Sequence, residues 1–207
     1  MARPGFASQP GAAVHPVTRP AWIALATLLG TGALAAWFVD RPLLDWQPAL
    51  VWSQPWRWWT AAWVHLSPMH LAVNLLGTAL LMALGWVAHC ERRDAAAWFV
   101  AWPLTHLGLL LQPTLAHYGG LSGVLHAGVV VAAIGLARRE RQARRALGLT
   151  LLLGVAVKLL LEQPWQGPLR EVPGWDIAIA PAAHLSGACA GALCALVPWR
   201  WPQPRQR

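Results

Sequence analysis

Six long apolar segments, separated by short polar ones, constrain this chain more than any other feature of its sequence. They cover residues 21–39, 67–88, 95–111, 121–137, 146–161 and 182–197. An apolar helix of about 20 residues crosses the hydrocarbon core of a bilayer, and the fourth and fifth segments are short enough that one or both could stop inside it. Hydrophobic residues make up 57% of the chain and charged residues 12%, against about 45–50% and 25% in soluble domains. We therefore predict an all-α membrane protein with six transmembrane helices.

The basic residues predict the orientation of these helices. On one side of the predicted membrane lie Arg3, Arg19, Arg92, Arg93, Arg138, Arg139, Arg141, Arg144, Arg145, Arg200, Arg205 and Arg207. The other side has only Arg41, Arg57 and Arg170. By the positive-inside rule, the tails 1–20 and 199–207 are cytoplasmic and flank a six-helix domain over 21–198. Topology thus explains the net charge of +8, and the cluster at 138–145 is expected to contact anionic lipid headgroups of the bilayer rather than nucleic acid.

The two long outer connections differ from the inner ones in composition. The chain has fifteen tryptophans, which we expect to serve mainly as anchors at the membrane interface. Residues 40–66 carry six of them and three prolines. Because Trp side chains favour the membrane interface, we expect this connection to lie there, anchored by Arg57. Residues 162–181 contain four prolines, which prevent a continuous helix. This second connection could act as a lid over a site that opens on its side of the membrane.

The acidic residues and cysteines exclude several classes of membrane protein. All eight Asp and Glu residues fall in the predicted connections, which argues against a proton-coupled transporter and against an intramembrane aspartyl protease. The chain has no His-Glu-x-x-His sequence, which disfavours a zinc protease. Its three cysteines are an odd number and do not form a complete set of disulfides, so we interpret them as free thiols. We expect neither a metal nor a cofactor.

Neutral polar residues remain near the outer ends of the second, fourth and sixth segments. His70 and Asn74 are four residues apart and share a helix face. Ser122 stands where the fourth segment begins, and His184 stands near the start of the sixth. All three segments enter from the same side, so these groups can converge.

This set of groups suits acyl transfer by a serine. A neutral imidazole, here that of His184, can accept the proton of a serine hydroxyl and make the oxygen of Ser122 a nucleophile. The amide of Ser122 at the helix start, together with His70 and Asn74, can donate to the developing oxyanion. Alternatively, His70 and Asn74 form a structural hydrogen-bonded pair between helices. Gly187 and Gly191 have the G-x-x-x-G spacing that allows close packing of membrane helices.

These motifs together resemble those of the rhomboid family of intramembrane serine proteases. The resemblance rests on Trp56-Arg57, His65, His70-x-x-x-Asn74, Gly120-Leu-Ser122-Gly123 and Ala183-His184-x-x-Gly187-x-x-x-Gly191, in that order. It implies a six-helix rhomboid fold, a Ser122–His184 dyad with no acidic third member, and an oxyanion hole from His70, Asn74 and the Ser122 amide. Gly120, Gly123, Gly187 and Gly191 would support this site. His65 would anchor the first connection.

Within that family the chain is most similar to the rhombosortases, because of its compact size and the stretch Gly120-Leu-Ser-Gly-Val-Leu-His126-Ala. Rhomboids commonly have an aromatic ring, often Tyr, where His126 stands, so His126 either supports the catalytic histidine or only packs. The resemblance implies a bacterial inner-membrane enzyme whose active site opens to the periplasm. Its membrane-anchored protein substrates would carry a C-terminal Gly-Gly-type sorting tail. The acyl-enzyme could be hydrolysed or passed to an amine acceptor.

Two alternatives remain open at this point. The chain could be a general rhomboid protease of transmembrane substrates, without the preference for sorting tails. It could also be a non-catalytic rhomboid-like binder of membrane proteins. Such binders typically lack the serine or the histidine, whereas this chain has both Ser122 and His184.

Overall fold

The computed structural model describes residues 20–198, and within that range the protein is helical and has no strand, only two isolated bridges. The long helices are α1 (Pro20–Ala36), α4 (Pro68–Val87), α5 (Arg92–Leu107), α6 (Ser122–Arg139), α7 (Gln142–Glu162) and α8 (Pro181–Leu196). Two short helices, α2 (Arg41–Leu44) and α3 (Arg57–Thr60), lie in the first connection. The all-α prediction is confirmed over these residues. Residues 1–19 of the predicted N-terminal tail and the whole predicted C-terminal tail 199–207 lie outside the described residues. They contain five of the twelve arginines counted on the cytoplasmic side.

Four of the long helices are apolar and long enough to cross a membrane, so the chain is a multi-pass membrane protein. They are α4, α5 with its 3-10 extension to Leu111, α6 and α7, whereas α1 and α8 are shorter apolar helices. The expectation that the fourth and fifth segments were the short ones was wrong, since α7 has 21 residues and α6 has 18. Both helices continue into the arginine-rich turn, where charged residues end the apolar run without ending the helix.

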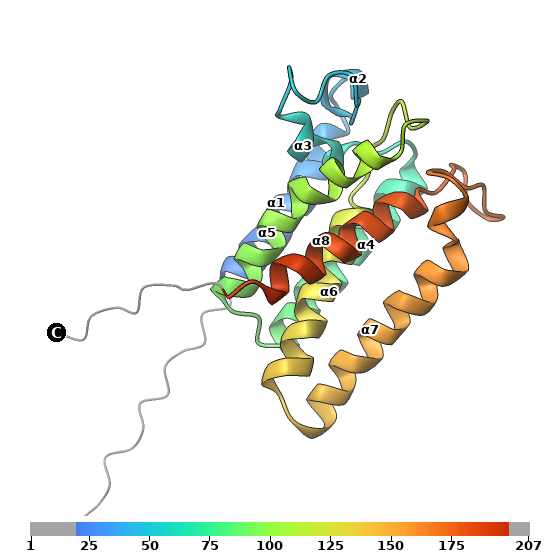
Figure 1. Cartoon of the computed structure of the whole chain (residues 1–207). Coiled ribbons are helices and arrows are strands. Elements are labelled where there is room, and N and C mark those ends of the chain that lie inside the picture. Colours follow the sequence, from blue (N-terminus) through green and yellow to red (C-terminus); the bar gives the residue numbers. More distant parts are fainter. Residues whose placement is uncertain (1–19, 199–207) are drawn as a thin grey trace, which may run out of the picture.

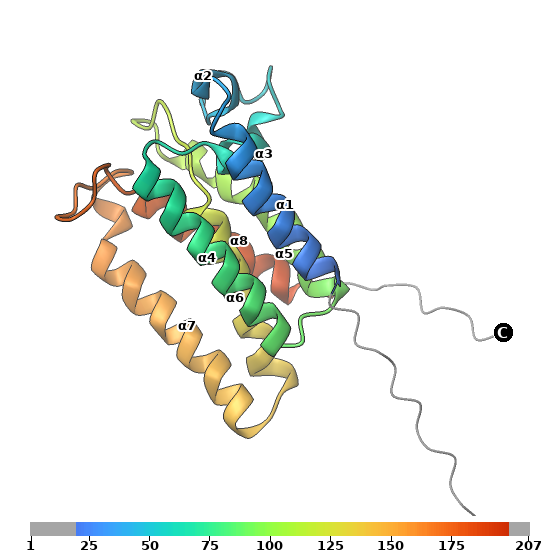
Figure 2. The ribbon, with the colours of Figure 1, turned by 180° about the vertical axis from the view of Figure 1, so that it is seen from behind.

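The long helices form one bundle with α6 near its centre (Figures 1 and 2). Helix α6 packs against α5, α7 and α8, and α1 pairs with α4. The turns α4–α5 and α6–α7 lie at one end of the bundle, and the connections 37–67, 108–121 and 163–180 lie at the other (Figure 1). Helix α7 stands at the edge of the bundle in both views.

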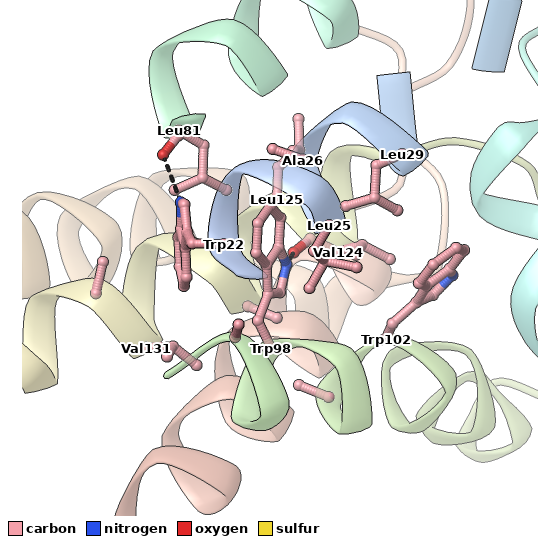
Figure 3. Packing of buried hydrophobic residues seen from close by; sticks show 14 of the residues in the cluster. Trp22, Leu25, Ala26, Leu29, Leu81, Trp98, Trp102, Val124, Leu125 and Val131 are labelled. Carbon is pink, nitrogen blue, oxygen red and sulfur yellow. Dashed lines mark hydrogen bonds between the residues drawn. The ribbon is translucent and has the colours of Figure 1, made fainter. Parts of the chain in front are cut away.

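Tryptophans build much of the core, which corrects the expectation that they serve mainly at the membrane interface. Trp22 of α1 and Trp98 of α5 pack against each other with ring centroids 4.5 Å apart and planes inclined by 34° (Figure 3). The Trp22 indole donates to the carbonyl of Leu81 at 3.0 Å, and that of Trp98 donates to Val124 at 2.8 Å. Buried indoles need such acceptors. Space for the rings comes from small residues: a Cβ at Gly128 would lie 2.7 Å from the Trp98 ring.

The first connection is held by the buried side chain of Arg57. Its guanidinium donates to the Asp45 carbonyl at 2.6 Å, to the Asp45 carboxylate at 3.0 Å and to the Pro42 carbonyl at 2.7 Å. Trp46 in this connection pairs through its backbone with Tyr118, four residues before Ser122. The interpretation of Arg57 as an anchor is confirmed, and the anchored segment is paired with the residues that precede α6.

Candidate active site

Ser122 is the first residue of α6, and a tight turn sets its position. Gly120 has a φ of +145°, which side chains other than glycine rarely adopt. Its N–H donates to the Ala61 carbonyl at 2.9 Å, and its own carbonyl accepts from the Tyr118 hydroxyl at 3.0 Å. Because the first N–H groups of a helix have no acceptor within it, the amide of half-buried Ser122 is available to a ligand.

The structure brings His184 to Ser122. His184 lies in the first turn of α8 and is 6% exposed. Its Nε2 atom is 2.9 Å from the Ser122 Oγ, a hydrogen-bond distance. The two residues are 62 positions apart in the sequence, so packing between helices α6 and α8 sets the distance.

Glycines allow these two helices to touch backbone to backbone. A Cβ at Gly123 would lie 2.7 Å from the Ala183 carbonyl oxygen. A Cβ at Gly187 would overlap the Gly123 carbonyl, and one at Gly191 would overlap the carbonyl of Ala127. Each glycine therefore keeps the Ser122 and His184 backbones close together.

A carboxylate lies on the far side of the His184 ring, where the resemblance predicted no acidic residue. The Glu162 Oε2 atom is 2.7 Å from the His184 Nδ1, and the other carboxylate oxygen pairs with Lys158. Glu162 is the last residue of α7 rather than part of a connection. Sequence reasoning missed it, although the i,i+4 spacing of Lys158 and Glu162 at the end of an apolar run was a signal for an ion pair on that helix.

His126 lies flat against His184. The two rings have centroids 4.4 Å apart and planes inclined by 18°. The His126 Nδ1 is 2.7 Å from the Ser122 carbonyl oxygen, and since a carbonyl only accepts, Nδ1 must carry the proton. Of the two alternatives for His126, this geometry favours support of the His184 ring.

His70 and Asn74 share the buried face of α4. The Leu66 N–H donates to the His70 Nδ1 at 3.3 Å, which leaves the proton on Nε2. That Nε2 lies beside the turn before Ser122, because a Cβ at Gly120 would be 2.9 Å from it. In the described part of the chain, the buried Asn74 Nδ2 has no hydrogen-bond partner. The His70 Nε2 thus lies beside the turn that leads to the nucleophile, and the Asn74 Nδ2 is an unpaired donor one helical turn further along α4.

His65 lies behind His70 rather than next to Ser122. Its ring is tilted against that of His70, with centroids 4.7 Å apart, and its Nδ1 is 3.0 Å from the Trp63 carbonyl oxygen. Burial lowers the pKa of His65 to about 4, so that it is neutral at pH 7. His65 therefore supports His70 as an uncharged ring.

The connection 163–180 is tied to the start of α4. The Ser67 hydroxyl donates to the Asp176 carboxylate at 2.9 Å and accepts from the His70 N–H at 3.0 Å as the N-cap of the helix. Asp176 was not singled out from the sequence, nor was Tyr118, the only tyrosine of the chain. Burial raises the pKa of Tyr118 to about 12, so its hydroxyl remains a donor.

The site thus combines a serine, an imidazole, a carboxylate and unpaired donors at one end of a helical membrane bundle. Between residues 20 and 198, no group of His, Cys, Asp or Glu side chains is arranged to hold a metal ion. The arrangement can carry out nucleophilic acyl transfer with general-base assistance.

Comparison with known families agrees with this chemistry. The family model of the rhomboid domain matches residues 53–201, well over half of the chain, and the chain belongs to the rhomboid family. Members of this family are in general intramembrane serine proteases that act on membrane-protein substrates. The predicted family is therefore confirmed. No curated protein matches the chain.

Proposed function

We propose that this chain is an intramembrane serine endopeptidase in which Ser122 is the nucleophile and His184 the general base. The observation that carries the proposal is the 2.9 Å contact between the Ser122 Oγ and the His184 Nε2 at the first residue of a helix. A serine that only packs between helices needs no imidazole in that position. The unpaired Asn74 amide and the His70 Nε2 beside Gly120 support an oxyanion hole next to it.

The chemistry follows from these positions. His184 takes the Ser122 proton while the oxygen attacks the carbonyl carbon of the scissile bond. The His70 Nε2, the Asn74 Nδ2 and the Ser122 amide donate to the oxygen that becomes negative. The tetrahedral intermediate collapses, His184 protonates the leaving amine, and the acyl-enzyme forms. Water, activated by His184, then releases the product.

We further propose six membrane crossings with both termini in the cytoplasm of a bacterium and the site open to the periplasm. The five arginines between 138 and 145 lie where α6 ends and α7 begins, at the end of the bundle opposite the connection 163–180 (Figure 1). The site is at the latter end, since Ser122 begins α6. The positive-inside rule therefore supports an outward-facing site.

The substrate class we propose is a membrane-anchored protein with a C-terminal Gly-Gly-type tail, as for rhombosortases. Support comes from the stretch Gly120 to Ala127 and from the compact size of the chain. Small residues let a substrate helix unwind and present an extended peptide bond. Co-expression with candidate tail-bearing proteins and mass determination of the released product test this preference against general cleavage of transmembrane helices. The mass of the released product also distinguishes hydrolysis of the acyl-enzyme from its transfer to an amine.

A serine-directed fluorophosphonate probe tests the catalytic proposal. We expect the purified wild type to be labelled and Ser122→Ala not to be. Ser186→Ala is the matched control, because Ser186 also lies on the bundle near the site but donates its hydroxyl to the Thr105 carbonyl at 2.7 Å. Equal labelling of the wild type and Ser122→Ala would contradict the nucleophile assignment. Absence of labelling in a folded wild type would favour the non-catalytic binder.

A further inference from the structure

We propose that Glu162 is a positioning residue for His184, so that this chain works with a Ser122–His184–Glu162 triad rather than a dyad. This inference rests on the proposed function, since it gives the base of that reaction a third partner. The carboxylate does not touch the scissile bond. It acts through the imidazole, by fixing which nitrogen carries the proton and how the ring is turned.

The hydrogen bonds on the two sides of the His184 ring determine the tautomer. An ionised carboxylate can only accept, so the 2.7 Å contact with the Glu162 Oε2 places the proton on Nδ1. Nε2 is then left with a lone pair, and it faces the Ser122 Oγ at 2.9 Å. This is the tautomer that a general base for Ser122 requires. Without the carboxylate, neutral imidazole could equally carry its proton on Nε2 and lose the ability to accept.

Glu162 occupies a position that is unfavourable for a carboxylate in isolation. It is the last residue of α7, where the helix dipole is negative and disfavours an anion, and its side chain is 14% exposed. A buried charge needs paired partners. Lys158 and His184 are those partners, so the carboxylate is held in place by one neighbour on its own helix and one on α8.

The end of α7 is also fixed by the backbone around it. Gln163 ends the helix in the left-handed region with a φ of +51°. The Arg170 guanidinium donates to the carbonyls of Leu161 at 3.0 Å and Glu162 at 3.2 Å, which are among the carbonyls that a helix leaves unpaired. Lys158, Arg170 and the left-handed residue thus hold the Glu162 carboxylate at the height of His184.

Stacking of His126 completes the restraint on the imidazole. The His126 ring covers one face of His184 with an inclination of 18°, which limits tilting. Stacking alone does not choose between the two ring nitrogens. The Glu162 contact does so, and the two restraints are therefore different in kind.

The test compares Glu162→Gln, Glu162→Asp and the control Glu171→Gln with the wild type by the rate constant of fluorophosphonate labelling. Loss of an acid that orients a catalytic histidine can cost up to about 10⁴-fold. We expect labelling of Glu162→Gln to slow by about 10- to 1,000-fold, with partial rescue in Glu162→Asp. Glu171→Gln makes the same change at an exposed carboxylate of the connection 163–180, so we expect it to stay within about threefold of the wild type. Thermal midpoints in the same detergent establish that each variant is folded.

A second readout reports the tautomer without any reaction. In protein carrying ¹⁵N-histidine, the His184 signals are identified by their loss in His184→Ala. We expect the Nδ1-protonated form in the wild type and in Glu171→Gln, and a mixture of tautomers in Glu162→Gln. If Glu162→Gln is labelled at the wild-type rate and keeps the wild-type tautomer, the role of Glu162 is overturned while the Ser122–His184 pair stands. An equal slowing in Glu171→Gln would also overturn that role. If a folded wild type reacts no faster than Ser122→Ala, the proposed function itself fails.

Discussion

Helices α6 and α7 differ sharply in how they are held, although one short turn joins them. Eleven of the 18 residues of α6 are buried, whereas α7 buries only Gly148 among its 21. The Ser122–His184 distance depends on backbone contacts between α6 and α8. The Glu162–His184 contact depends on side chains at the end of an exposed helix. The two halves of the site should therefore respond differently to substitution.

Asn74→Ala should have the largest effect, because it removes a proposed oxyanion donor from the packed part of the molecule. Loss of one such donor typically costs about 10²–10³ in rate. We expect that loss in cleavage of a tail-bearing substrate, with little change in the thermal midpoint, since the Asn74 Nδ2 has no partner to lose among residues 20–198. Thr78→Ala, one turn further along the same buried face, is the control. An equal loss in Thr78→Ala would assign the effect to helix packing instead.

A comparison of Gly187→Ala with Gly154→Ala tests whether the packed helices α6 and α8 are more sensitive to an added methyl group than the exposed helix α7. The added Cβ at Gly187 overlaps the Gly123 carbonyl, and overpacking typically costs about 1–3 kcal/mol. A shift of about 1 Å between reacting groups can cost about 10² in rate, so we expect labelling to fall by that order and the thermal midpoint to drop.

At Gly154 on α7, an added Cβ meets nothing within 4 Å. We expect Gly154→Ala to label at the wild-type rate. Its thermal midpoint should be unchanged or higher, since Ala is favoured over Gly in a helix by about 1 kcal/mol. Equal behaviour of the two variants would refute the difference between the helices.

His126→Ala should slow labelling about tenfold, because the His184 ring loses the surface that limits its tilt while its hydrogen bonds remain. His126→Tyr restores a flat ring at the same place, and we expect it to recover most of the rate. The comparison separates stacking from the His126 hydrogen bond to the Ser122 carbonyl, which Tyr cannot reproduce in the same way. Failure of every aromatic replacement would point to that hydrogen bond as the important contact.

Asp176→Ala should have the smallest effect and the opposite sign. The substitution removes the hydrogen bond between the connection 163–180 and Ser67, and one such bond contributes about 0.5–1.5 kcal/mol. We expect a two- to fivefold faster reaction with a bulky fluorophosphonate and faster proteolytic cutting of this connection. Glu171→Ala, in the same connection, is the control. Slower labelling in Asp176→Ala would mean that this connection orders the site rather than covering it.

The sequence allowed the serine, the histidine and the α4 donors to be predicted because each stands in a local motif at the end of an apolar segment. Glu162 could not be placed in the same way. It is 22 residues from His184, and its contact depends on where α7 ends and how the following connection turns. The buried Trp22 and Trp98 were misjudged for a similar reason, since their environment is created by glycines on other helices. The helix lengths were underestimated wherever arginines continue a helix beyond its apolar run.

Mass spectrometry that locates the fluorophosphonate adduct in the wild type and in His184→Ala tests the nucleophile and the base together. We expect a single adduct on Ser122 in the wild type and a labelling rate at least about 10³-fold lower in His184→Ala. An adduct on another serine, or labelling of Ser122 at an undiminished rate without His184, would contradict these assignments.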